Sequence, residues 1–214
     1  KMPAHRGRNF VVRKGKDLEE RFIGNAFMLN EAERERILKH PTGKYPHTAL
    51  TKPFYDKAKD LDDVTKMQYI DIHFWLIGDI LLKADKMSMA NSLEVRVPFL
   101  DRVVFDVARK VPTEYKVNKE NTKFAMRQAA HRYLPDMVAE KKKLGFPVPI
   151  RIWLREENYY NMVKEAFHSP AAEEFFKVDE IMKYLDEHKA GKADNSRKIW
   201  TIYMFLVWHK QFFG

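Results

Sequence analysis

The sequence contains no cysteine, and only 8 of its 214 residues are glycine. Without cysteine there is no disulfide framework, thiol nucleophile, iron–sulfur cluster or cysteine-based zinc site. No two glycines are adjacent and no G-x-G pair occurs. A phosphate-binding loop needs clustered glycines, because several backbone N–H groups must turn toward the anion. These 214 residues therefore contain neither a P-loop nor a dinucleotide-binding fingerprint.

Long apolar runs are also lacking. The longest uninterrupted one extends from Ile202 to Trp208, far below the roughly 18 residues that a membrane span requires. No apolar region near the start is typical of a signal peptide. We therefore expect no membrane partner and a cytoplasmic location, where a cysteine-free chain is most ordinary. Because Lys1 precedes Met2, we also expect the chain to be a piece of a longer protein.

Charge of both signs is abundant, with 39 Lys and Arg against 30 Asp and Glu and a net charge of +9. A basic chain can bind nucleic acid, but here the lysines are spread along the sequence and interleaved with acids. We therefore favour solvated helix faces and expect no nucleic-acid partner, and a basic helical nucleic-acid-binding or interaction module stays open as a distant alternative. The eight histidines show no H-x-x-x-H or H-E-x-x-H spacing, and no G-x-S-x-G elbow marks a nucleophile.

The apolar periodicity predicts helices nearly throughout. Asn30 and Glu33 have the spacing of a capping box, Asp101 is placed to cap a further helix, and Ser169 precedes a proline at a first helical position. A short strand at residues 10–12 is the only strand signal. The predicted helical ranges are 31 to about 40, 63–90, 101–111, 121–133, 150–166, 170 onward, 179–189 and 195–213.

Two of these ranges carry more specific expectations. Gly78 lies within 63–90, and because glycine weakens a helix interior, we expect a break there into two helices. The final range, 195–213, is apolar on nearly every face. A helix of that kind is normally buried, so we expect it to be a core element.

Two segments could carry chemistry. The segment from Asp79 to Asp101 places acids and bases in an apolar background, with Asp85 and Lys86 followed by Glu94 and Arg96. Charged residues are rarely buried unless they are paired. We therefore expect Glu94 to pair with Arg96, and either an active-site cluster or a structural network stays open.

The second segment is Lys141–Pro149, with the sequence KKKLGFPVP. Its cations lie on a loop that glycine and two prolines constrain, not on a helix face. A lysine on such a loop can neutralise phosphate charge in a transition state. The alternative from the residues alone is an exposed lysine-rich loop.

Together these segments resemble the C-terminal part of the synthetase domain of glutamine-hydrolysing asparagine synthetases. The family pattern D-x-L-x-K-x-D-R-x-S-M-A-x-S-L-E-x-R-x-P-F-L-D is matched over 79–101, with Lys86 where arginine is usual. The pattern R-x-K-x-G-F-x-x-P is matched over 141–149, with Lys141 in place of arginine. The remaining matches are a lysine and an arginine, a Leu-Pro pair and a tryptophan: Lys123, Arg127, Leu134, Pro135 and Trp153.

The resemblance implies a fold class. The chain would be the mainly α C-terminal portion of an α/β synthetase domain of the adenine-nucleotide-hydrolase-like, PP-loop ATP pyrophosphatase type, with its parallel sheet mostly missing. Residues 1–60 would be a peripheral basic start with helices, 61–155 would carry the active-site motifs, and 156–214 would be C-terminal helices.

The resemblance also implies a reaction. Aspartate attacks ATP to give β-aspartyl-AMP and pyrophosphate, and ammonia from glutamine then displaces AMP, with Mg²⁺ assisting. Lys143 would be catalytic, while Asp85, Lys86, Glu94 and Arg96 would line or brace the site, and no residue of this chain would bind metal. β-Lactam synthetases and peptide-modifying relatives share the domain, so another acceptor stays open.

Three parts of the family's machinery do not occur in these 214 residues. They are the Ser-Gly-Gly-x-Asp-Ser pyrophosphate loop, the acidic Gly-x-Asp-Glu segment for Mg²⁺ and the N-terminal cysteine of the glutaminase domain. We therefore expect the isolated fragment to be inactive, to bind ATP poorly and to carry no cofactor. Whether the protein forms a homo-oligomer stays open.

Overall fold

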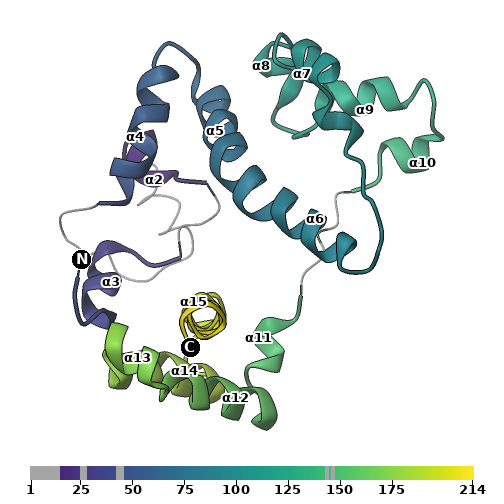
Figure 1. The fold of residues 1–214 in the computed structure, drawn as a ribbon. Helices are drawn as coiled ribbons and strands as arrows, with labels where there is room; N and C mark the ends of the chain where they lie inside the picture. Colours follow the sequence, from purple (N-terminus) through teal and green to yellow (C-terminus); the bar gives the residue numbers. More distant parts are fainter. Residues whose placement is uncertain (1–14, 25–27, 42–45, 143–144, 146–147) are drawn as a thin grey trace. The chain divides into compact units, whose positions relative to one another are not determined.

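The computed structural model describes residues 15–24, 28–41, 46–142, 145 and 148–214 (Figure 1). These residues form helices joined by turns, without a β-strand; the one isolated bridge pairs Leu38 with Phe176. The mainly α fold class is confirmed for them, and the expected strand at 10–12 lies outside the described residues. No helix in the described ranges is long and apolar enough to cross a membrane.

The chain divides into two compact units. Unit 1 contains residues 1–25 and 51–145, and unit 2 contains residues 26–50 and 146–214. The division after Gly145 falls within the lysine-rich segment, which therefore connects the two units. The expected functional segments 1–60, 61–155 and 156–214 concern motifs and stay a prediction.

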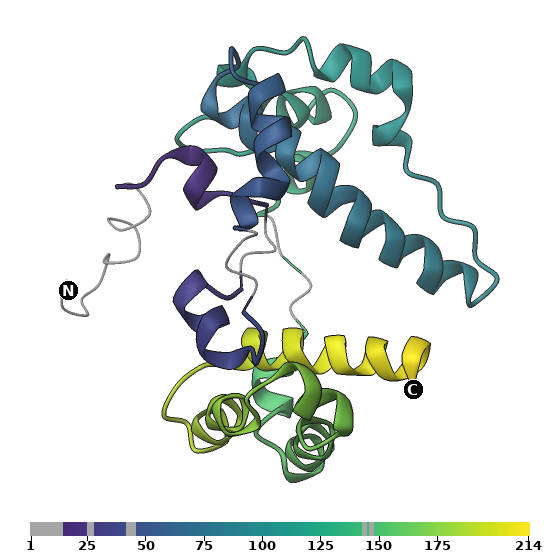
Figure 2. The same ribbon diagram turned by 60° about the vertical axis from the view of Figure 1, so that its left-hand side comes forward.

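Unit 2 has a continuous hydrophobic core. It is built by α3 (Glu31–Ile37), α11 (Ile150–Trp153), α12 (Glu157–Phe167), α13 (Pro170–Phe175), α14 (Val178–Lys189) and α15 (Ser196–Phe213). Helix α15 lies across α12, α13 and α14 (Figure 2). The buried core side chains are Ile37, Leu154, Val163, Phe167, Ala172, Phe176, Ile181, Tyr184, Leu185, Ile199, Ile202 and Leu206.

Local side-chain hydrogen bonds fix the helix ends of unit 2 as the sequence predicted. The backbone N–H of Glu33 donates to Asn30 Oδ1 (2.9 Å) and that of Asn30 donates to Glu33 Oε2 (3.1 Å), which confirms the capping box. Ser169 Oγ accepts from the N–H of Ala172 at the start of α13. After α14, Gly191 has a φ of +72°, the left-handed conformation in which glycine commonly ends a helix.

Two predictions for unit 2 are wrong in part. The range 150–166 is not one helix, because the chain turns at residues 154–156 between α11 and α12. Helix α15 is not buried on every side. Ile199, Ile202 and Leu206 face the core, while a second apolar stripe is exposed: Trp200, Met204, Val207, Trp208 and Phe212.

Unit 1 is organised around a long continuous helix, in which α5 (Asp63–Asp71) passes into a π-helix, η1 (Ile72–Leu81), and then into α6 (Leu82–Met89) (Figure 1). The predicted break at Gly78 is wrong. A glycine weakens a helix, but it does not remove an N–H or a C=O, so the backbone hydrogen bonds can continue. The wider turn of a π-helix changes the register instead, so the faces of α5 and α6 are not in simple helical phase.

Shorter elements complete unit 1. They are α2 (Leu18–Arg21), α4 (His47–Lys57), of which residues 51–57 belong here, the 3₁₀ turn η2 (Pro98–Leu100), α7 (Arg102–Ala108), α8 (Thr113–Lys116), α9 (Phe124–Ala130) and α10 (Asp136–Ala139). The predicted cap of α7 is confirmed, since Asp101 Oδ1 accepts from the N–H of Val103 (2.8 Å). The predicted helix 121–133 is shorter than expected, because the side chains of Asn118 and Asn121 bind backbone N–H groups in turns.

Asp62 links two helix starts of unit 1. Its carboxylate caps α5 through the N–H groups of Val64 and Thr65, and it also accepts from the Thr113 hydroxyl at the start of α8 (3.0 Å). The Thr65 hydroxyl, 2.6 Å away, is the main cause that lowers the pKa of Asp62 below its usual value. The ionised carboxylate thus holds α5 and α8 together.

The two faces of α15 predict different sensitivities to truncation. Ile202 is 2% exposed and Met204 is 40% exposed. In the 214-residue chain, Ile202→Ala should lower the free energy of unfolding by about 2–5 kcal/mol, because it leaves a cavity in a packed core. The control Met204→Ala should change it by about 0.5 kcal/mol or less. Urea unfolding followed by circular dichroism measures both values; equal losses would contradict the assigned orientation of α15.

Candidate functional site

The structure places Asp85 and Lys86 on α6, with both side chains exposed. They are adjacent in sequence, and adjacent residues on a helix do not face each other. Within the described ranges, no ion pair or hydrogen bond joins either side chain to Glu94 or Arg96. The four predicted residues are therefore not assembled into one cluster by these contacts.

A left-handed residue ends α6. Ser92 has a φ of +57°, which is uncommon for a residue with a side chain. Its N–H donates to the carbonyl of Met89 (3.0 Å), and the N–H of Leu93 donates to the carbonyl of Ser88 (2.9 Å). This pair of bonds is the Schellman arrangement, in which glycine or asparagine is usual at the position of Ser92. No sequence pattern predicted this helix end.

Glu94 and Arg96 form the predicted pair. Arg96 Nη2 lies 2.6 Å from Glu94 Oε1, with 83% of the arginine side chain and 65% of the glutamate side chain exposed. The pairing is confirmed. In this chain it is a solvated ion pair, whose contribution to stability is typically small.

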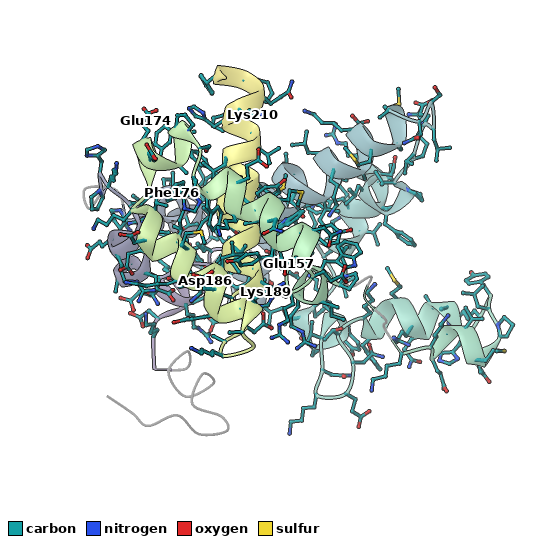
Figure 3. All side chains as sticks on the ribbon, turned by 90° about the horizontal axis from the view of Figure 1, so that it is seen from below. Glu157, Glu174, Phe176, Asp186, Lys189 and Lys210 are labelled. Carbon is teal, nitrogen blue, oxygen red and sulfur yellow. The ribbon has the colours of Figure 1, made fainter. Side chains whose placement is uncertain are left out.

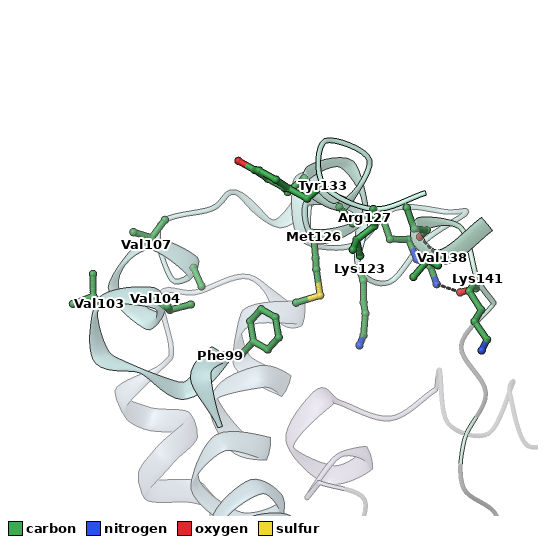
Figure 4. Close-up of a pocket in the computed structure, with 15 residues that line it drawn as sticks. Phe99, Val103, Val104, Val107, Lys123, Met126, Arg127, Tyr133, Val138 and Lys141 are labelled. Atoms are coloured by element: carbon green, nitrogen blue, oxygen red, sulfur yellow. Dashed lines mark hydrogen bonds between the residues drawn. The ribbon is translucent and has the colours of Figure 1, made fainter. Parts of the chain in front are cut away.

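Lys143, the predicted catalytic residue, lies outside the described residues. Its neighbours Lys141 and Lys142 are exposed. The guanidinium of Arg127 on α9 holds the backbone at this point. It donates from Nη1 to the carbonyl of Ala139 and from Nη2 to the carbonyl of Lys141, both at 2.8 Å (Figure 4). The start of the lysine-rich segment is thus attached to α9.

The same arginine borders an open apolar pocket of about 940 Å³ within unit 1 (Figure 4). Met126 points toward the Phe99 ring across it, while the lysines at the rim bring positive charge. The other lining side chains are mostly aliphatic. Such a surface can bind apolar groups, and its titratable lining side chains are Lys123, Arg127, Tyr133 and Lys141. The lining residues are Phe99, Val103, Val104, Val107, Ala108, Lys123, Met126, Arg127, Ala129, Ala130, Tyr133, Leu134, Val138, Ala139 and Lys141.

Sequence reasoning missed a group of buried polar side chains around the turn after α2. Burial raises the pKa of Asp71, whose Oδ1 is buried without a hydrogen-bond partner among the described atoms. Gly24, with a φ of +80°, lies so close that a Cβ there would be 3.3 Å from that oxygen. Tyr55 donates to the carbonyl of Phe22 (2.7 Å), and burial raises its pKa to about 12. No motif in the sequence pointed to these residues.

Unit 2 buries His188 on α14 together with Asn195 and Ser196 at the start of α15. Its Nε2 donates to the carbonyl of Arg151 on α11 (2.9 Å), and its Nδ1 accepts from the N–H of Asn195 before α15 (3.3 Å). Nδ1 also lies 3.3 Å from the carbonyl of Ala193. His188 therefore joins three helices and has a structural role.

The surface charges near α14 form local pairs. Lys189 binds Glu157 (2.7 Å), and Tyr160 donates to Asp186 (2.7 Å), a bond that raises the pKa of the tyrosine to about 12 (Figure 3). Both contacts join α12 to α14. These charged side chains therefore have partners within the protein and need no ligand to explain them.

No group of three or more histidine, aspartate or glutamate side chains in the described part of the chain is arranged to hold a metal ion. The candidate site has three features, all in unit 1. They are the Glu94–Arg96 ion pair on the segment after α6, the start of the lysine-rich segment that Arg127 holds, and the apolar pocket that Arg127 borders.

Comparison with known proteins decides the family. The sequence profile of the family described as asparagine synthase matches residues 4–210. The chain belongs to this family. It is 46% identical over 204 residues to asparagine synthetase [glutamine-hydrolyzing] 1 of Bacillus subtilis, covering 95% of this chain and 32% of that protein.

Two further relatives have names of the same kind. A putative glutamine-hydrolysing asparagine synthetase of Mycobacterium bovis is 42% identical over 207 residues, which is 97% of this chain and 32% of that protein. Asparagine synthetase B of Escherichia coli is 32% identical over 91 residues, or 42% of this chain and 16% of that protein. No solved structure matches the chain. The chain spans about a third of the length of the curated relatives that it matches over most of its own length.

The exposure of the Glu94–Arg96 pair predicts a small effect of breaking it in this chain. Arg96→Ala should change the free energy of unfolding by about 1 kcal/mol or less. The matched control is Arg109→Ala, which breaks the exposed pair with Asp106 (2.9 Å) on α7. Thermal unfolding of both variants measures the effect. A loss of about 3–5 kcal/mol for Arg96→Ala alone would show that the pair is buried in solution.

Proposed function

We propose that the chain is the C-terminal part of the synthetase domain of an ATP-dependent enzyme that makes asparagine from aspartate and ammonia released from glutamine. Membership of the asparagine synthase family across nearly the whole chain carries this proposal. The names of the relatives, all glutamine-hydrolysing asparagine synthetases, favour aspartate over another acceptor. A β-lactam synthetase-like or peptide-modifying enzyme is the alternative within the same family.

The proposed chemistry has two steps. A side-chain carboxylate oxygen of aspartate attacks the α-phosphorus of ATP, and pyrophosphate leaves. The nitrogen of ammonia then attacks the acyl carbon, AMP leaves, and the nitrogen loses a proton. Forming the acyl adenylate replaces a poor leaving group by a good one. Charge develops on the departing pyrophosphate, and a fixed cation nearby stabilises it.

In this chain we assign that cation to Lys143. Its support is the match of Lys141–Pro149 to the family loop and the anchoring of the segment's first carbonyl by Arg127. We assign Asp85, Lys86, Glu94 and Arg96 to the lining or bracing of the same site in the longer protein. Mg²⁺ is part of the family's chemistry, but the described residues contain no suitable cluster, so we give it no ligand here.

The isolated chain should not catalyse the reaction. It lacks a clustered-glycine loop for pyrophosphate. In addition, apolar side chains of the motif segment, residues 79–101, are exposed in unit 1, including Leu93, Val95 and Phe99. We expect pyrophosphate release from ATP, aspartate and ammonia to stay at background for the purified 214-residue chain. The longer protein that contains it is the positive control, and turnover by the chain alone would contradict the proposal that the pyrophosphate loop lies elsewhere.

In the longer protein, Lys143→Ala should abolish asparagine synthesis while glutamine hydrolysis continues. The reason is that the variant removes charge stabilisation at the leaving phosphates, which is typically worth about 10²–10³-fold in rate, and does not touch ammonia production. Asparagine and glutamate formation are measured in parallel.

The matched control is Lys142→Ala, which removes the adjacent exposed lysine. It should leave synthesis within about twofold of the unmodified protein, because surface substitutions away from special features have small effects. Unchanged asparagine output in Lys143→Ala would refute the catalytic assignment.

A further inference from the structure

We propose that the apolar pocket of unit 1 binds an anionic amphiphile, a small molecule with one alkyl chain and one carboxylate. The alkyl chain lies on the apolar wall, and the carboxylate lies beside the lysines of the rim, Lys123 and Lys141. The inference goes beyond the proposed function and does not depend on it, because it gives these residues no part in amide synthesis. It uses only residues of unit 1 that the structure describes.

The pocket has the size of a small-molecule site. Its volume is about 940 Å³, and sites for small ligands typically measure about 300–1,000 Å³. Four elements contribute side chains to its wall: η2, α7, α9 and α10. The exposed apolar stripe of α15 differs in this respect, because it belongs to a single helix.

The wall of the pocket leaves apolar surface in water. Phe99 is 69% exposed and Val103 is 73% exposed. Removal of such surface from water is favourable in proportion to its area. Met126 points across the pocket toward the Phe99 ring (Figure 4), and the flexible thioether of a methionine adapts its shape to what it contacts. An alkyl chain on this wall would therefore gain free energy from burial without a demand for one exact shape.

The charged side chains of the pocket are all cations. They are Lys123, Arg127 and Lys141, and none of the described lining residues is an aspartate or a glutamate. The guanidinium of Arg127 is already engaged with two backbone carbonyls. The amines of Lys123 and Lys141 have no hydrogen-bond or ion-pair partner in the described ranges. Two unpaired cations beside an apolar wall favour a ligand with negative charge.

The apolar surface and the charge occupy different parts of the pocket. Figure 4 shows Phe99 and the valines of α7 toward one end, and Lys123 and Lys141 toward the other. A lysine can lay its aliphatic stem on apolar surface while its amine stays in water. The carboxylate of the ligand can therefore pair with an amine and remain partly hydrated, which avoids the cost of burying a charge. This arrangement selects an anionic amphiphile over a cationic one.

Isothermal titration calorimetry of the 214-residue chain with dodecanoate, below its micelle concentration, tests the proposal. We expect one saturable site with a Kd below about 1 mM. Octanoate has four fewer methylenes and should bind at least about tenfold more weakly, because each fully buried methylene is worth about fourfold in affinity. Dodecyltrimethylammonium has an alkyl chain of the same length and the opposite charge, and it should bind at least about fivefold more weakly than dodecanoate. Equal affinities for the two compounds overturn the proposal.

Matched substitutions test the two halves of the site. Lys123→Glu should weaken dodecanoate binding at least about fivefold. Lys119→Glu makes the same charge change at an exposed lysine outside the pocket, and should change it less than about twofold. Val104→Asn should weaken binding about fivefold, whereas Val95→Asn, at a valine of similar exposure outside the pocket, should not. Because Lys123 is exposed, its replacement disturbs no core, and unchanged binding by Lys123→Glu overturns the placement of the carboxylate.

Methyl NMR of the methionine-labelled chain gives a readout that is independent of affinity. Dodecanoate should shift the Met126 methyl signal, assigned with Met126→Leu, and leave that of Met204 on α15 unchanged. A shift at Met204 without one at Met126 places the ligand on α15 and overturns the proposal. Unsaturable uptake, or binding to phosphatidylglycerol vesicles without binding to dodecanoate, overturns it as well. None of these measurements involves asparagine synthesis, so their failure leaves the assignment of Lys143 untouched, and an active Lys143→Ala leaves the pocket proposal untouched.

Discussion

Burial of one apolar helix face against another is the interaction on which unit 2 depends. Val163 and Phe167 of α12 and Ile181 and Leu185 of α14 belong to one buried cluster. The core-facing side chains of α15, among them Ile202, complete it. Burying a side chain of this size is worth about 1.5–3 kcal/mol, which outweighs the small contributions of the surface ion pairs. The helix caps and the His188 contacts then fix how these faces meet.

The motif-bearing part of unit 1 lacks this kind of burial. In the described residues from η1 to α9 no side chain of the motif segment is fully buried, and many of its apolar residues are exposed. Large exposed apolar surfaces usually mark an interface. The relatives are about three times as long as the match. Glu94 and Arg96 are solvated in the same part of unit 1.

Features that depend on residues close together in sequence were predictable. The capping box at Asn30 and the caps at Asp101 and Ser169 each need only a side chain and a backbone N–H a few residues away. Features that depend on which surfaces meet were not. Periodicity showed α15 to be apolar on most faces, but it could not show that the side of α15 that carries Trp200 is exposed in the part of the chain that the structure describes. Propensity likewise could not reveal that the backbone at Gly78 would widen into a π-helix instead of ending.

The same distinction bears on one departure from the family pattern. Lys141 stands where arginine is usual, yet Arg127 holds the carbonyl of that residue and not its side chain. On the other side of the loop, His188 likewise holds the carbonyl of Arg151. The carbonyl of Lys141 and that of Arg151, two residues beyond the lysine-rich segment, are therefore each held within one unit through backbone atoms, which every residue type provides. Side chains at Lys141 and Arg151 can vary without loss of these hydrogen bonds, whereas Arg127 and His188 cannot, because their side chains make the bonds.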